Sequence, residues 1–84
     1  KIYKSAELYF NLSNYKSALI YYDNLLEEYF DTEYADDALY GKIQVLIIKR
    51  RFDDARNEIE RFEKKFSASP YRGKVNILKS QIPL

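Results

Sequence analysis

The chain repeats a helical pattern at an interval of 37 residues, and this repetition limits the folds open to it. Apolar residues recur at steps of three and four from Tyr15 to Tyr29, and the same stripe returns from Phe52 to Phe66. A shift of 37 residues aligns the two stripes: Tyr15 with Phe52, Ala18 with Ala55, Tyr22 with Ile59, Leu25 with Phe62 and Tyr29 with Phe66. An interval of this length that contains two helices predicts an α-solenoid.

Capping signals divide the chain into five expected helices. Ser13 or Asn14 can cap the second helix, and Thr32 can cap the third. Ser69 followed by Pro70 suits the N-cap and the first residue of the last helix. No segment shows sustained strand alternation, so the predicted fold class is all-α. The helices are expected near residues 1–12, 15–29, 33–50, 52–66 and 70–81.

We expect one domain over residues 1–84, with repeat 1 at about 1–30, repeat 2 at about 33–67 and a terminal half-repeat at about 70–82. Leu19 and Leu26 are placed to receive the next helix of the array. In the second unit they become Arg56 and Glu63, so the face that meets the last helix is more polar. This predicts a capping helix at the end of the array. A contact of Arg56 and Glu63 with another subunit is the alternative.

Composition argues against an enzyme. The 84 residues include no His and no Cys, which removes the commonest general base, the thiol nucleophile and most transition-metal ligands. Two glycines cannot build a phosphate-cradling loop. The carboxylate pairs Asp36/Asp37 and Asp53/Asp54 each open a helix, where the helix dipole accounts for them. We therefore expect a non-enzymatic binding protein without cofactor or metal.

The repeated pattern resembles the tetratricopeptide repeat (TPR), which pairs antiparallel helices A and B. Its small residue in helix A falls on Ala6, with the bulkier Ile43 in the second unit. Its large residue three places on falls on Tyr9 and Leu46. In helix B, the opening aromatic residue falls on Tyr15 and Phe52, the alanine three residues later on Ala18 and Ala55, and the next aromatic residue on Tyr22 and Ile59. The family's repeat-ending proline is absent, because Phe30 and Ser67 occupy those positions. The resemblance implies a TPR-type solenoid of about two and a half repeats.

The join between the units, residues 31–38, is three residues longer than the family norm and is similar to the joins of periplasmic TPR proteins. It resembles the BamD (YfiO) family of outer-membrane assembly lipoproteins. That resemblance implies a periplasmic scaffold, tethered to the outer membrane by a lipid anchor upstream of the chain, that binds outer-membrane protein clients or subunits of the β-barrel assembly machine. BamD-like proteins usually carry about five repeats, so this chain would supply only the N-terminal half or a shortened version. The alternative is a generic interaction or oligomerisation module, either CpoB (YbgF)-like and periplasmic or cytoplasmic.

Side chains of the A helices that face away from the B helices line the concave side of such a solenoid. Aromatic and isoleucine side chains beside amides suit a peptide, because they accept apolar side chains and bond the backbone. Packing of Tyr3 on Tyr40 along the inner wall is the alternative. Gly41 fits close approach of a peptide backbone, close approach of a B helix, or simple tolerance. The predicted groove residues are Tyr3, Glu7, Phe10, Asn11, Asp37, Tyr40, Gln44, Ile47, Ile48 and Ile77, with Gly41, Lys74 and Gln81 beside them.

Charge and hydropathy give expectations about partners. Residues 1–41 hold three basic and eight acidic side chains, and residues 42–84 hold eleven basic and five acidic ones. The acidic half opposes nucleic-acid binding, so no nucleic-acid partner is expected. The longest purely apolar run, residues 45–48, is far short of the roughly 20 residues that a membrane span needs. The run of basic residues 49–51 ends a helix and is expected to be solvated.

Overall fold

The computed structural model describes residues 8–30 and 34–83, which contain helices and no strand. The all-α expectation is therefore confirmed for this part of the chain. The start of the expected first helix, the Thr32 cap and the Glu33 helix start lie outside the described residues. Residues 8–11 are helical, and the helices that follow are α2 (Tyr15–Tyr29), α3 (Ala35–Ile48), α4 (Phe52–Lys65) and α5 (Arg72–Ser80).

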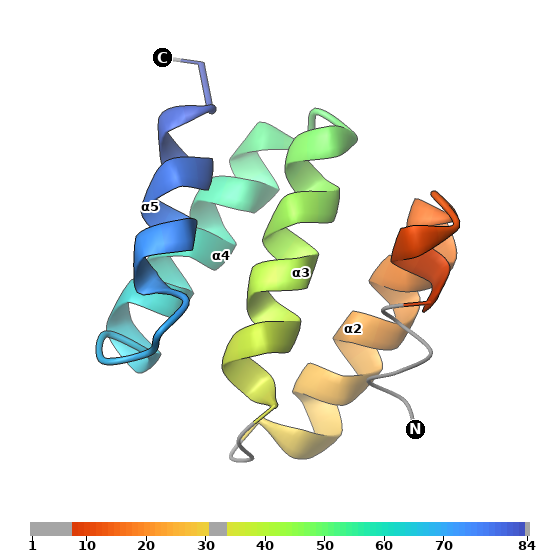
Figure 1. Cartoon of the computed structure of the whole chain (residues 1–84), viewed down its shortest axis with the longest axis horizontal. Helices are drawn as coiled ribbons and strands as arrows, with labels where there is room; N and C mark the ends of the chain where they lie inside the picture. Colours follow the sequence, from red (N-terminus) through yellow and green to blue (C-terminus); the bar gives the residue numbers. More distant parts are fainter. Residues whose placement is uncertain (1–7, 31–33, 84) are drawn as a thin grey trace.

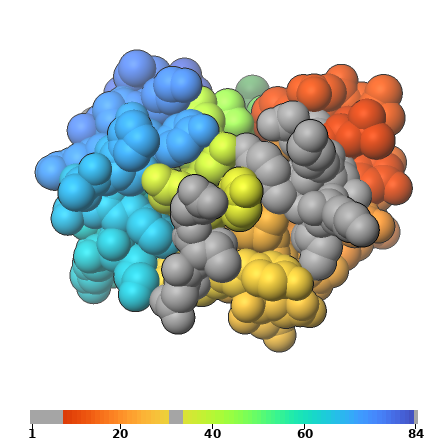
Figure 2. Space-filling model, turned by 60° about the horizontal axis from the view of Figure 1, so that its bottom comes forward, coloured from red at the N-terminus to blue at the C-terminus, as the bar shows by residue number. Residues whose placement is uncertain are grey.

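Helix α3 is the centre of the arrangement. It packs against α2 on one side and against both α4 and α5 on the other (Figure 1). Figure 2 shows the same order from a second direction, with α4 and α5 adjoining at one end and α2 and residues 8–11 at the other. The shortest extent of the molecule is 18 Å, about two helix diameters, so the helices form two layers.

The core includes three of the residue pairs that the 37-residue shift aligns, Ala18 with Ala55, Tyr22 with Ile59 and Leu25 with Phe62. Ala18 and Ala55 are fully buried, and the paired Leu25 and Phe62 are 3% and 0% exposed. The small alanines allow close helix packing, and the large partners fill the space beside them. The other buried apolar residues are Tyr22, Leu26, Ala35, Ala38, Leu39, Ile43, Val45, Leu46, Ile59 and Val75. α3 supplies most of these, as its central position requires.

Two turns of the chain are built in the same way, 37 residues apart. Ser13 and Arg50 both have left-handed backbone, with φ of 59° and 60°. The N–H of Asn14 donates to the carbonyl of Tyr9 at 2.8 Å, and that of Arg51 donates to Leu46 at 2.8 Å. These bonds define a Schellman C-cap that ends one helix and turns the chain into the next. The sequence interval is thus also a repeat in backbone geometry.

Two predicted helix ends are corrected by the structure. α3 ends at Ile48 rather than near residue 50, because Arg50 leaves the helical region. α5 begins at Arg72 rather than at Pro70. The hydroxyl of Ser69 instead accepts from the N–H of Tyr71 at 3.0 Å, so it closes a turn before the helix. The predicted Asn14 cap is present, since its side chain accepts from the N–H of Ser17 at 3.4 Å.

The polar face of α4 meets the C-terminal segment of the same chain. Arg56 donates to the carbonyl of Pro83 at 2.6 Å, and Glu63 lies 3.1 Å from the ammonium of Lys79 on α5. These contacts place Arg56 and Glu63 against the C-terminal segment of the same chain. Among the described residues, no helix is long and apolar enough to cross a membrane.

Candidate functional site

Part of the predicted groove forms one hollow of about 400 Å3. It lies between residues 8–11, the middle of α3 and the start of α5. The predicted residues that line it are Phe10, Asn11, Asp37, Tyr40, Gly41, Gln44 and Lys74, and two residues absent from the prediction, Tyr22 and Tyr71, complete the lining. Asp37, Tyr40 and Gln44 are spaced by three and four residues on α3, so they present one face to the hollow.

An aromatic pair forms the wall of the hollow between α3 and α5. The ring centroids of Tyr40 and Tyr71 are 5.2 Å apart at an interplanar angle of 31°. The ammonium of Lys74 lies 5.9 Å from the Tyr40 centroid and 5.4 Å from that of Tyr71. A cation at this distance from two ring faces is attracted by both. Lys74 therefore places a positive charge beside an aromatic wall.

Hydrogen bonds fix both rings of this pair. The amide nitrogen of Gln44 donates to the Tyr40 hydroxyl oxygen at 3.1 Å. The Tyr71 hydroxyl is hydrogen-bonded to Asp37; burial first, and then this carboxylate, raises the pKa of Tyr71 to about 12. Tyr71 is consequently a neutral donor at physiological pH, held in place by the first turn of α3.

The opposite wall comes from residues 8–11. Phe10 meets the ring of Tyr15 edge to face, with centroids 5.7 Å apart. Its neighbour Tyr9 stacks on Tyr21 of α2 at 5.3 Å. The two contacts dock this short helical segment on α2, which holds Phe10 and the exposed Asn11 at the rim of the hollow. Edge-to-face and offset stacking are the favoured arrangements of aromatic rings.

A side chain of α2 occupies the space next to Gly41. A Cβ built on Gly41 would lie 2.6 Å from the hydroxyl oxygen of Tyr22 and 2.7 Å from its Cε1. The ring of Tyr22, 5% exposed, fills the space that a larger residue at position 41 would need. Of the three interpretations of Gly41, the structure therefore favours close approach of a neighbouring helix, here α2 through Tyr22.

The remaining predicted groove residues lie elsewhere. Ile47 is half-buried and packs on the core, whereas Ile48 and Ile77 are 47% and 61% exposed and do not line this hollow. Gln81 is exposed after the end of α5. Tyr3 and Glu7 lie outside the described residues. Tyr71 was missed, although its place three residues before Lys74 puts both on one face of the chain.

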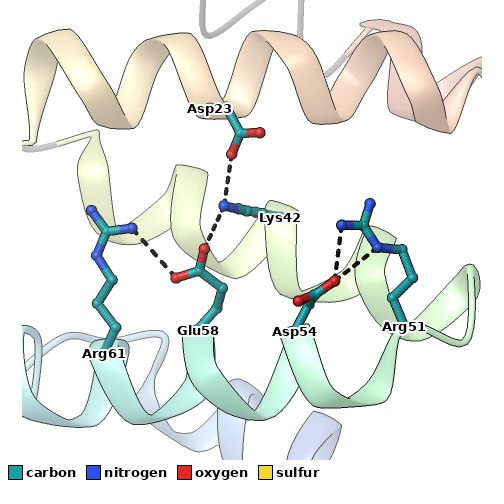
Figure 3. Close-up of polar contacts among 6 residues, drawn as sticks. All are labelled: Asp23, Lys42, Arg51, Asp54, Glu58 and Arg61. Atoms are coloured by element: carbon teal, nitrogen blue, oxygen red, sulfur yellow. Dashed lines mark hydrogen bonds and ion pairs between the residues drawn. The ribbon is translucent and has the colours of Figure 1, made fainter.

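A cluster of charged side chains, which the sequence analysis did not find, connects three helices (Figure 3). The ammonium of Lys42 on α3 lies 2.7 Å from Asp23 of α2 and also contacts Glu58 of α4. Glu58 in turn lies 3.3 Å from Arg61. Burial acts to lower the pKa of Lys42, but the hydrogen bonds and charges of Asp23 and Glu58 outweigh burial and raise that pKa above its usual value. Lys42 is charged and ties α2 to α4.

The lining of the hollow combines several kinds of side chain. Aromatic rings, the amides of Asn11 and Gln44, the Lys74 cation and the Asp37 carboxylate, which is bonded to Tyr71, surround the hollow. Within residues 8–30 and 34–83, no group of three or more His, Cys, Asp or Glu residues is placed to hold a metal ion. No family model, curated protein or solved structure matches this chain.

Proposed function

We propose that the protein is a non-enzymatic scaffold of helical repeats that holds a segment of another protein in the hollow between residues 8–11, α3 and α5. The observation that carries this proposal is the convergence of three aromatic rings, Phe10, Tyr40 and Tyr71, with the amides of Asn11 and Gln44 around one hollow. Its volume, about 400 Å3, is in the range of ligand pockets in proteins.

A peptide suits this lining better than a small polar ligand. The rings of Tyr40 and Tyr71 offer flat apolar surface to a side chain, and their own hydroxyls are already bonded to Gln44 and Asp37. The exposed amide of Asn11 offers both a donor and an acceptor to a peptide backbone. An apolar or aromatic side chain with its adjoining backbone therefore satisfies both parts of the hollow.

We further propose a BamD-like role in the assembly of outer-membrane β-barrel proteins. The support is the resemblance of the repeat and its lengthened joins to that family, together with a hollow suited to peptides that end in aromatic residues. In this proposal the protein resides in the periplasm, tethered to the outer membrane by a lipid anchor, and its partners are client segments or subunits of the assembly machine. A cytoplasmic location is the alternative.

A generic oligomerisation module is the second candidate. It is favoured by large apolar side chains that remain exposed at several points of the surface, among them Leu12 at 66% and Ile77 at 61%. Sedimentation velocity separates the two roles. A stable dimer at micromolar concentration supports oligomerisation, whereas a monomer that binds peptide supports the scaffold.

The test of the scaffold is a titration followed by amide chemical shifts, with a peptide that copies the C-terminal strand of an outer-membrane barrel. We expect shifts at Phe10, Tyr40 and Gln44. Tyr40→Leu should weaken binding about fivefold, because aromatic contacts contribute roughly 1 kcal/mol beyond their area. Tyr29→Leu, at an exposed tyrosine outside the hollow, is the matched control. Saturating peptide without shifts at these residues would refute the proposal.

A further inference from the structure

The segment that precedes α5 is joined to the first turn of α3 by a closed ring of hydrogen bonds. The Ser69 hydroxyl donates to Oδ2 of Asp36 at 2.5 Å, and Oδ1 of Asp36 accepts from the N–H of Asp37 at 2.8 Å. The Ser69 oxygen accepts from the N–H of Tyr71 at 3.0 Å, and the Tyr71 hydroxyl is bonded to Asp37. These four residues are here called the latch. The two carboxylates thus hold the segment before α5 as well as opening α3.

Apart from the latch, α5 is attached to the molecule by few buried side chains. Val75 is its one buried residue, and seven of its nine residues are exposed. Leu78, and Ile82 just after the helix, are partly buried against the core. The two polar contacts with α4 described above lie at the surface, where such contacts contribute little. By comparison, α2, α3 and α4 bury four, seven and three residues, so α5 is the least anchored of these helices.

As a separate helix, α5 has little stability of its own. It is nine residues long, and isolated helices shorter than about 12–15 residues are marginal in water. Its second residue, Gly73, is a poor helix former. No neighbouring atom lies within 4 Å of a Cβ built on Gly73, so packing does not offset that weakness. The helix is therefore folded because it is docked on α3 and α4.

The connection between α4 and α5 has a fixed end and an exposed middle. Phe66, at the end of α4, packs on Phe62 and Phe30, with ring centroids 5.6 Å and 5.4 Å away. Residues 67 and 68, which follow it, are exposed. Figure 1 shows α5 at the edge of the molecule, with this connection at one end of the helix. Rotation of the backbone in the exposed residues would move α5 away from α3 and leave α4 in place.

We propose that α5 is a movable wall of the hollow, which detaches from α3 and α4 while α2, α3 and α4 stay folded, and which a bound protein segment holds closed. Detachment carries Tyr71 and Lys74 out of the hollow, so the ring of Tyr40 loses both its aromatic partner and the cation beside it. Elements with few buried apolar contacts open locally in this way. Closure by a bound segment rests on the proposed function, whereas the opening of α5 does not.

The latch sets how often α5 opens. Its two side-chain hydroxyls are bonded to carboxylates, and hydrogen bonds to charged groups are stronger than those between neutral groups. Both bonds break when α5 detaches. The pairs that Lys42 makes with Asp23 and Glu58 join α2, α3 and α4 and stay intact in the detached state. Loss of the latch should therefore raise the population of the open state, whereas loss of the Lys42 pairs should not.

The test is native-state hydrogen exchange of the intact chain, followed by NMR. The amide of the fully buried Val75 donates to the Tyr71 carbonyl at 2.9 Å, so it exchanges when α5 opens. Relative to intrinsic rates, we expect Val75 to exchange at least about tenfold faster than Ile43 of α3, with less dependence on urea. Lys42→Met should speed exchange at Ile43 and leave Val75 unchanged. Equal protection of the two amides, or an equal effect of Lys42→Met on both, would overturn the proposal.

A second variant tests the latch itself. Ser69→Ala with Tyr71→Phe removes both latch hydroxyls and keeps the aromatic ring, and it should speed exchange at Val75 about tenfold. Tyr15→Phe is the matched control, because it removes a hydroxyl on α2, a helix that does not contact α5. It should leave the exchange of Val75 unchanged. A double variant that exchanges at the parent rate would contradict the role given to the latch.

The barrel-strand peptide tests closure of the wall. At a free concentration ten times its dissociation constant, the peptide should slow exchange at Val75 about tenfold, because it binds the closed state. A peptide that shifts Tyr40 without slowing Val75 would show that α5 is no part of the binding site and would refute closure. A peptide that does not bind would refute the proposed function, and the exchange of the free chain would still decide whether α5 opens by itself.

Discussion

At the scale of single residues, the contact of Gly41 with Tyr22 explains why a glycine is kept in the middle of a buried helix. A glycine inside a helix costs about 1 kcal/mol relative to alanine. The cost is offset because the Tyr22 ring lies where a Cβ would be. The other glycine, Gly73 on α5, has no atom within 4 Å of a built Cβ, so packing gives no reason for it.

These two glycines give opposite predictions for the same substitution. Gly41→Ala should destabilise the fold by about 1 kcal/mol, because overpacking costs roughly 1–3 kcal/mol and exceeds the helix gain. Gly73→Ala should stabilise it by about 1 kcal/mol. Urea denaturation of both variants beside the parent chain measures the difference. Equal effects of the two substitutions would contradict the role given to Tyr22.

Arg50 gives a third prediction at this scale. A non-glycine residue with left-handed backbone costs roughly 1–2 kcal/mol, and Arg50 has a φ of 60° on the exposed surface. Arg50→Gly removes that cost and should raise stability by about 0.5–1 kcal/mol after the entropy of glycine in the unfolded chain is subtracted. Thermal unfolding followed by circular dichroism is the measurement. A lower midpoint would show that the Arg50 side chain stabilises the turn.

At the scale of helices, the ion pairs of Lys42 connect α3 to both α2 and α4, in addition to the apolar contacts between these helices. Lys42→Met should cost about 1–3 kcal/mol, since it leaves the carboxylates of Asp23 and Glu58 without their shared cation. Lys79→Met, which breaks an exposed pair with Glu63, should cost less than about 1 kcal/mol. Chemical denaturation of the two variants tests the contrast. Similar losses would mean that partial burial adds nothing to the Lys42 pairs.

The helices also show where sequence reasoning succeeds and where it stops. α2 and α4 begin where their apolar stripes begin, and their predicted ends are correct to within one residue. The start of α5 was misplaced, because Ser69 and Pro70 have the residue types of an N-cap but form a turn instead. The role of Lys42 was missed, because ion pairs between different helices do not follow from the spacing of residues along the sequence.

The groove was only partly predictable for a related reason. Helical spacing correctly places Tyr40 and Gln44 on one face of α3, because that face follows from the 3.6-residue period alone. Spacing cannot show that Ile48 and Ile77 lie outside the lining of the hollow, because this depends on how far each helix is rotated against its neighbours. The hydrogen bond of Tyr71 to Asp37 depends on the same packing.

At the scale of the whole molecule, stability should fall in alkaline solution. Both Lys42 and Tyr71 have raised pKa values when folded, so the folded state binds their protons more tightly than the unfolded state. Their contribution is present in full below the unfolded values of 10.5 and 10.0 and is lost as pH rises through the folded ones, about 12 for Tyr71. Urea midpoints at neutral pH and at about pH 11 measure this loss.

Substitution separates the two contributions. Tyr71→Phe removes the titrating hydroxyl, so the variant should lose less stability than the parent between neutral pH and about pH 11. The remaining alkaline loss in that variant is assigned to Lys42 and should shrink in Lys42→Met. A parent chain whose stability is constant over this range would contradict the bonding assigned to both residues.

The two matching turns at Ser13 and Arg50 make the chain modular. Each turn closes with the same pair of backbone bonds, so residues 14–50 form a cassette that begins and ends at equivalent joints. A second copy of this cassette inserted after Arg50 would add one helix pair through a turn that the chain already uses. The number of helix pairs in such a protein would then be set by the number of cassettes.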